Sequence, residues 1–152
     1  MARCPLTIPF VGRAGAKPEI YTYGHRNGYG LAVNPETGGL WHQPWARPGM
    51  DNPRIHWVPS ISPSSIIFYT GDKFPKEKNN LFVGALTTQQ LIRIAFHQPS
   101  QAEQREGLLI PLQQRIRDPV QSPDGYLYVA TEKSIRGNTA DGTVLRIEPA
   151  DR

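Results

Sequence analysis

The stretch QRIRDPVQSPDGYLYVAT, residues 114–131, decides how the fold of this chain is predicted. It places Arg115 and Arg117 one residue apart, just before a Ser-Pro-Asp-Gly turn and an alternating run of aromatic and aliphatic residues. Residues i and i+2 of an extended chain point the same way, so both guanidinium groups are expected on one face or edge. Two adjacent forks of donors suit a planar, multiply charged anion, although solvated edge arginines leave the same pattern. We predict a charged loop braced by a β-hairpin.

Short β-forming runs separated by turns recur along the rest of the chain, and no segment keeps the 3.6-residue period of a helix. The sequence therefore predicts an all-β chain, with an irregular lead-in over 1–18 and one domain over 19–149. Loops are predicted over 42–63, with 55–58 extended, and over 97–106 and 132–142. Strands are predicted at 19–23, 31–33, 40–41, 65–70, 81–86, 90–96, 107–112, 126–129 and 143–147.

The strands repeat. Leu40, Leu81 and Leu127 each follow a turn and begin a similar short run, at separations of 41 and 46 residues. The words LIRI at 91–94 and VLRI at 144–147 are nearly the same. A period of about 40 to 45 residues with four short strands per unit is typical of β-propeller blades. The chain holds about three such units, which leaves open edges, so it is either part of a ring or one of several copies that complete one.

Composition limits the class of protein. A chain of 152 residues, 38% hydrophobic and 20% charged, is long enough for one domain with a core. The net charge of +4 permits an anionic partner, but the basic residues form no run, which disfavours nucleic acid. Cys4 is alone, so neither an internal disulfide nor a cysteine-based metal site is expected. No apolar stretch approaches the roughly 20 residues of a membrane span, and MARCPLTIPFV lacks the apolar region of a secretory signal.

Several longer segments occur in a specific order. They are GHRN at 24–27, GLAVNPETGGLW at 30–41, HWVPSISPSSIIFYTGDKFP at 56–75, NNLFVGAL at 79–86, QQLIRI at 89–94, QRIRD at 114–118 and SPDGYLYVAT at 122–131. As a set, over about residues 17–149, they resemble the C-terminal half of the soluble quinoprotein glucose/sorbosone dehydrogenases, which include the aldose sugar dehydrogenases. The resemblance implies a partial six-bladed β-propeller. It also implies an enzyme that binds pyrroloquinoline quinone (PQQ) and calcium, oxidises the anomeric carbon of an aldose to a lactone, and passes electrons to an acceptor.

The same resemblance assigns cofactor contacts. In the family, the arginine and asparagine of GHRN and the two arginines of RIRD contact the quinone. In this chain they are Arg26, Asn27, Arg115 and Arg117. The assignment agrees with the chemistry of the residues, because PQQ is a flat tricarboxylate and planar, multiply donating cations suit it.

Departures from the family are also visible. The catalytic base of the family is a histidine upstream of GHRN, and His25 belongs to a different motif, so no catalytic residue is assigned. The calcium loop that follows Trp41 in the family is expected to be deleted here, and His42, His56 and His97 have no ligand spacing, so no metal ligand is assigned either. We expect the lone chain to lack turnover. The family is commonly periplasmic or secreted, and the compartment of this chain stays open.

Two alternatives remain at this stage. One is a non-catalytic propeller remnant that binds a partner or self-associates through its open blade edges. A monomeric mass in solution would count against pairing of those edges. The other is a truncated chain that does not fold stably, which a broad, non-cooperative melt would reveal.

Overall fold

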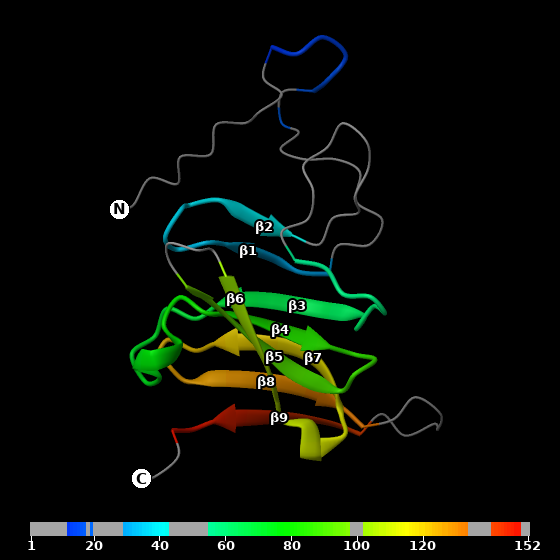
Figure 1. The fold of residues 1–152 in the computed structure, drawn as a ribbon, viewed down its shortest axis with the longest axis vertical. Coiled ribbons are helices and arrows are strands. Elements are labelled where there is room, and N and C mark those ends of the chain that lie inside the picture. The colour runs from blue at the N-terminus through cyan, green and yellow to red at the C-terminus, as the bar shows by residue number, and fades with distance from the viewer. Residues whose placement is uncertain are drawn as a thin grey trace.

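The computed structural model of the chain describes residues 12–17, 19, 29–42, 55–97, 102–133 and 141–149. Within these ranges the strands form three antiparallel sheets that follow one another along the molecule (Figure 1). The first sheet is β1 (Leu31–Val33) and β2 (Leu40–His42), the middle sheet is β3 (Pro63–Phe68), β4 (Leu81–Ala85), β5 (Gln90–His97) and β6 (Ala102–Leu108), and the last sheet is β7 (Arg115–Gln121), β8 (Leu127–Glu132) and β9 (Gly142–Ile147). Short 3-10 helices, η1 (Pro75–Glu77) and η2 (Ile110–Leu112), lie in the connections. The all-β prediction is confirmed, and no described helix is long and apolar enough to cross a membrane.

The repeat predicted from the sequence is visible in the register of the sheets. Leu40, Leu81 and Leu127 are each the first residue of the second strand of their sheet. Leu81 pairs with Ile94, and Leu127 pairs with Ile147, so the third strands also correspond. The strand pairing, and not sequence similarity alone, therefore defines which residues of the sheets are equivalent.

Three local predictions were wrong. Residues 97–106 are not all loop, because β6 pairs along β5 from 102 to 108. The strand predicted at 107–112 ends at Leu108, where Leu109 adopts a left-handed conformation (φ 62°) and η2 follows. The charged loop predicted around Arg115 is instead the start of β7. Segment 55–58, predicted to be extended within the 42–63 loop, lies in no strand, which is compatible with that loop. The predicted strand 19–23 lies outside the described residues, apart from Glu19.

The middle sheet is covered on both faces because β4, LFVGA, sends its side chains alternately to two clusters. Burying a side chain of this size contributes about 1.5–3 kcal/mol. The first cluster lies toward β1 and β2 and consists of Ile61, Phe68, Leu81, Val83, Ala85, Ile92 and Ile94, against which Ala32 and Trp41 pack. The second cluster lies toward the last sheet and consists of Tyr69, Phe82, Leu91, Ile116, Leu127 and Val129.

Polar contacts fix the joint between the middle and last sheets, where β7 lies against β3 and β4. The buried Ser64 hydroxyl donates a hydrogen bond of 2.7 Å to the Ile116 carbonyl oxygen. A Cβ at Gly84 would lie 2.4 Å from the Ser64 Oγ and 3.0 Å from that carbonyl oxygen, so the approach of β7 requires glycine there. The two backbones are therefore held at close range.

Two segments with distinctive sequences meet at one end of this joint. The Tyr69 hydroxyl, from YTGDKFP, donates to the Gly125 carbonyl oxygen of the Ser-Pro-Asp-Gly turn at 2.7 Å. The same hydroxyl oxygen accepts hydrogen bonds from the backbone N–H groups of Lys73 and Phe74. The Gln121 Oε1 accepts from the Gly71 N–H at 3.0 Å and from the preceding residue's N–H at 2.7 Å. These motifs bind the sheets to each other.

Candidate anion site on strands β7 and β8

The site is positioned by the first residues of β7. Gln113, in a left-handed conformation (φ 49°), ends η2 just before the strand. The register of β7 against β8 shifts between Ile116 and Asp118, so Arg117 is the extra residue of a β-bulge. Ile116 is fully buried and anchored through its carbonyl oxygen, which fixes the strand between the two arginines.

Both guanidinium groups converge on one carboxylate, that of Glu132 at the end of β8. The Arg117 Nε donates to Glu132 Oε2 at 2.7 Å, and its Nη2 contacts the same oxygen. The Arg115 Nη1 lies 3.7 Å from that oxygen. Both arginines therefore reach the same carboxylate, although Arg117 is the extra residue of the bulge, and two positive charges share one negative charge.

One donor of this group has no partner. The Arg115 Nε is buried and makes no hydrogen bond within the part of the chain that the structure describes. The side chains of Arg115 and Arg117 are 23% and 46% exposed, so both are partly accessible to solvent. A buried unsatisfied donor costs about 1–3 kcal/mol. An anion bound beside β7 would offset the residual positive charge of the pair.

The four predicted cofactor residues are not all described. Arg115 and Arg117 lie together on β7, whereas Arg26 and Asn27 lie outside the described residues, as does His25. Sequence reasoning missed Glu132. Its signal was the alternation of β8, since Glu132 follows Leu127 by five residues and therefore lies on the strand face opposite to that buried leucine.

Metal-ligating side chains do not gather in the described ranges. No group of three or more histidine, cysteine, aspartate or glutamate side chains there could hold a metal ion. The described backbone carbonyl of His56 instead accepts a hydrogen bond from the Arg105 Nη1 at 3.2 Å. These residues give no reason to place a metal at the anion site.

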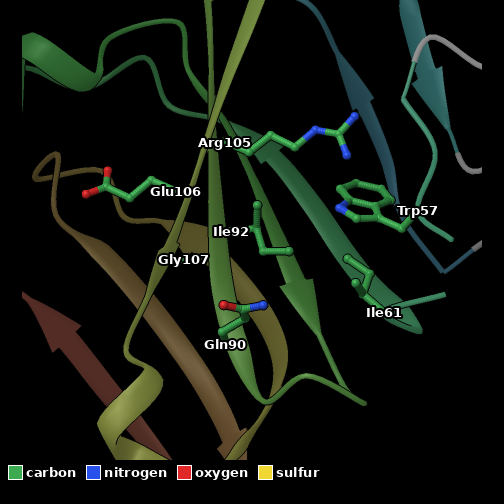
Figure 2. A pocket seen from close by; sticks show the side chains of 7 residues that line it. All are labelled: Trp57, Ile61, Gln90, Ile92, Arg105, Glu106 and Gly107. Carbon is green, nitrogen blue, oxygen red and sulfur yellow. The ribbon is translucent and has the colours of Figure 1, made fainter. Parts of the chain in front are cut away.

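A hollow of about 190 Å³ lies elsewhere, beside β5 and β6 (Figure 2). The Arg105 guanidinium lies over the Trp57 ring, 5.1 Å from its centroid, in a cation–π contact. Ile61 and Ile92, which line the hollow, belong to the first cluster, on the face of the middle sheet that is turned away from β7. The hollow is therefore separate from the arginine pair. Its lining residues are Trp57, Ile61, Gln90, Ile92, Arg105, Glu106 and Gly107.

Comparison with known proteins identifies the class. Residues 2–45 and 42–146 match the model of the glucose/sorbosone dehydrogenase family, and the chain belongs to that family. The two matched segments meet just after Trp41, where the family resemblance implies that a calcium loop is deleted.

Individual relatives define how much of such a protein is present. The chain is 31% identical to aldose sugar dehydrogenase YliI of Escherichia coli (strain K12) over 180 aligned positions, 93% of this chain and 47% of that protein. A solved glucose dehydrogenase, 34% identical, superposes with a TM-score of 0.77 over 97% of this chain and 48% of its own. The PQQ-bound aldose sugar dehydrogenase of Streptomyces coelicolor, 20% identical, shares the fold with a TM-score of 0.62 over 83% of this chain and 44% of its own. The chain spans about half the length of the proteins it matches.

Proposed function

We propose that this chain forms one wall of the PQQ pocket of a sugar dehydrogenase. The observation that carries the proposal is the convergence of Arg115 and Arg117 on the single carboxylate of Glu132, which leaves the pair with a residual positive charge. Family membership supports it, and so does the PQQ-bound form of a protein with the same fold. Arg26 and Asn27 are proposed to contribute the remaining contacts from the GHRN segment.

The residues of the site suit a flat polycarboxylate. Each guanidinium offers a planar fork of donors that matches a carboxylate, which a lysine ammonium would not. Glu132 holds the two like charges together before binding, and its contact with Arg117 is half-exposed and therefore readily exchanged for a ligand carboxylate. Arg115, which is less exposed than Arg117, is expected to keep its position and to add its positive charge to the binding of the ligand carboxylate.

The chemistry supplied by a bound quinone would be the two-electron oxidation of an aldose at its anomeric carbon to a lactone. An aldose and an electron acceptor are therefore the proposed partners, and calcium is a cofactor that the family resemblance adds. None of the residues in this sequence is assigned as the base that must take the proton of the anomeric hydroxyl. We expect the 152-residue chain to bind PQQ without oxidising a sugar by itself.

A binding titration tests this proposal. The purified chain is titrated with PQQ, with and without calcium, by following the absorbance of the quinone. The Arg115→Ala/Arg117→Ala double variant is expected to lose at least roughly tenfold in affinity, because it removes two charge-assisted contacts. Arg105→Ala is the matched control, since this arginine lies over Trp57 in the separate hollow, and it should bind like the parent chain. Absence of saturable binding, or equal binding by the double variant, would overturn the proposal.

Glu132 offers a second, opposite test. Glu132→Gln removes the competing carboxylate and keeps the side-chain shape, so it is expected to tighten PQQ binding and steepen its dependence on salt. Weaker binding in this variant would contradict the role given to Glu132. Dye reduction with glucose, added to the same samples, would reveal a base that the sequence does not identify.

A further inference from the structure

The last sheet has one face that nothing in the described chain covers. Side chains of β8 alternate, so those facing away from the second cluster are half-buried while the others are buried. Val144 on β9 is 72% exposed and Val120 on β7 is 47% exposed. We call this surface the leading face; it consists of Val120, Tyr128, Ala130, Val144 and Arg146.

The leading face repeats a face that is packed elsewhere in the same molecule. Because Leu81 and Leu127 are equivalent, Tyr128 on β8 corresponds to Phe82 on β4. Phe82 is buried in the second cluster, against the last sheet. The other pairs follow from the register: Ala130 corresponds to Gly84, Val144 to Leu91 and Arg146 to Arg93. An aromatic, a small, an aliphatic and an arginine side chain thus recur in order on both faces.

The opposite end of the molecule has a complementary surface. On β1, Leu31 is 65% exposed and Val33 is 46% exposed, and Leu40 on β2 is half-exposed. We call these three residues the trailing face. By register they correspond to Ile66, Phe68 and Leu81 of the middle sheet.

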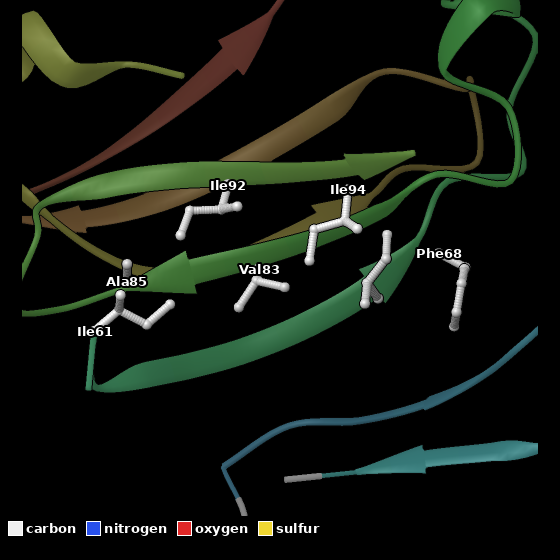
Figure 3. Packing of buried hydrophobic residues seen from close by; sticks show 7 residues of the cluster. Ile61, Phe68, Val83, Ala85, Ile92 and Ile94 are labelled. Carbon is white, nitrogen blue, oxygen red and sulfur yellow. The ribbon is translucent and has the colours of Figure 1, made fainter. Parts of the chain in front are cut away.

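Those three counterparts are already engaged within the chain. Phe68 meets the Trp41 ring edge-on, with ring centroids 5.3 Å apart. Figure 3 shows Phe68, Val83 and Ile94 on the side of the middle sheet that faces β1 and β2. The trailing face therefore presents the residue positions with which a sheet of this chain contacts the sheet before it.

We propose that the trailing face of one copy docks on the leading face of a second copy, and that two copies close into a ring. Within the chain, the first sheet packs on the middle sheet through the first cluster, and the middle sheet packs on the last sheet through the second cluster. In both contacts, the positions equivalent to the leading face of one sheet meet the positions equivalent to the trailing face of the next, and the proposed interface repeats this contact. Head-to-tail contacts form a closed assembly when the rotation returns to its start.

The comparisons set the number of copies. Solved glucose dehydrogenases are covered to 48% and 52% by 97% of this chain, with TM-scores of 0.77 and 0.78. Two copies therefore supply the length of one matched chain, and a two-fold axis makes the two interfaces identical. The docking of the two faces follows from register and exposure, the number of copies follows from the matched lengths, and neither depends on PQQ binding.

The test is the mass of the chain in solution, measured by light scattering during size-exclusion chromatography. The parent chain is expected at twice its mass of 17.0 kDa. Val144→Lys on the leading face and Leu31→Lys on the trailing face should each halve the observed mass, because every copy uses both faces. Ile110→Lys is the matched control: Ile110 is 54% exposed in η2, on neither face, and should stay dimeric. Circular dichroism checks that each variant folds, as expected because substitutions at exposed positions usually cost little stability.

Mixing the two lysine variants sharpens the test. The trailing face of the Val144→Lys chain and the leading face of the Leu31→Lys chain are both intact, so an equimolar mixture should regain the doubled mass through one interface. A monomeric parent chain would overturn the proposal, and so would a dimer that only one of the two variants dissociates, which indicates pairing of like faces. Assemblies larger than two copies would overturn closure by two.

Discussion

Strands β4 and β8 occupy the same place in their sheets and yet differ sharply in burial. All five residues of β4 are buried, whereas β8 alternates between buried and half-buried residues. Both strands begin at an equivalent leucine and pair in the same register with the next strand. The difference comes from their neighbours: β4 has a sheet on each side, and β8 has one on a single side in the described chain. Position in the repeat sets which way a side chain points, and the number of adjacent sheets sets how much that side chain stabilises the fold.

The largest expected effect comes from Phe82→Ala compared with Tyr128→Ala. Phe82 is 4% exposed between the two sheets, so its truncation should cost about 3–5 kcal/mol. Tyr128 at the equivalent position faces outward and should cost less than about 1 kcal/mol in the monomer. Urea denaturation of both variants at low protein concentration measures the difference.

Protein concentration then connects this comparison to the proposed ring. If two copies associate, the cost of Tyr128→Ala should rise as concentration rises, while that of Phe82→Ala should change little. If both variants lost the same free energy of unfolding in a monomeric sample, the number of adjacent sheets would not determine how much a side chain stabilises the fold.

A second prediction concerns how closely β7 approaches β4. Gly84→Ala should cost about 1–3 kcal/mol, because the new methyl group would lie 2.4 Å from the Ser64 Oγ. Ser64→Ala should cost about 1–2 kcal/mol, because it leaves the buried Ile116 carbonyl oxygen without its donor. In the double variant the obstructing hydroxyl is gone, so the combined cost should fall below the sum of the two. Denaturation of the four chains tests this, and strict additivity would mean that the two residues do not constrain the same contact.

The elements of the fold that depend on local sequence were predictable. The hairpin β1–β2, the strands β4 and β5, and the Ser-Pro-Asp-Gly turn were all expected, because alternation and turn residues are local signals. The turn forms with Gly125 at φ 86° and a hydrogen bond from its N–H to the Ser122 carbonyl oxygen. The equivalence of Leu40, Leu81 and Leu127 was likewise visible, since a repeat is written in the sequence itself.

What the sequence could not predict depends on partners that are distant in the chain. Strand β6, AEQREGL, has the composition of a loop, and it is a strand because the β5 backbone offers it a pairing edge. Strand β7 contains Pro119, which is tolerated because β7 is an edge strand of its sheet. At the candidate site, the closeness of Arg115 and Arg117 was expected from their spacing, whereas the bulge at Arg117 and the role of Glu132 as their common partner required the register with β8.

The smallest expected effect is the loss of stability at low pH that comes from Asp124, in the Ser-Pro-Asp-Gly turn between the middle and last sheets. The Asp124 carboxylate accepts a hydrogen bond from the Ser122 hydroxyl, which is the main reason that its pKa lies below the usual 3.8. The partial loss of hydration is the next-largest cause and raises the pKa, whereas smaller contributions from the N–H groups of Tyr126 and Asp124 and from the Arg146 charge lower it, so the net shift is downward. The adjacent Gly125 carbonyl oxygen accepts a hydrogen bond from the Tyr69 hydroxyl, so the turn is part of the contact between the middle and last sheets.

The sign follows from the lowered pKa. A carboxyl group that ionises more readily in the folded chain stabilises it above the unfolded pKa, and this stabilisation is lost as pH falls through the lower folded value. The melting temperature should therefore fall as pH drops below about 4, and Asp124→Asn should show a shallower decline over the same range. The difference should be small, because Asp124 is fully exposed to solvent. Thermal melts of both chains from neutral pH to about pH 3 measure it; identical slopes would show that the joint is held by Tyr69 and Ser64 without help from this carboxylate.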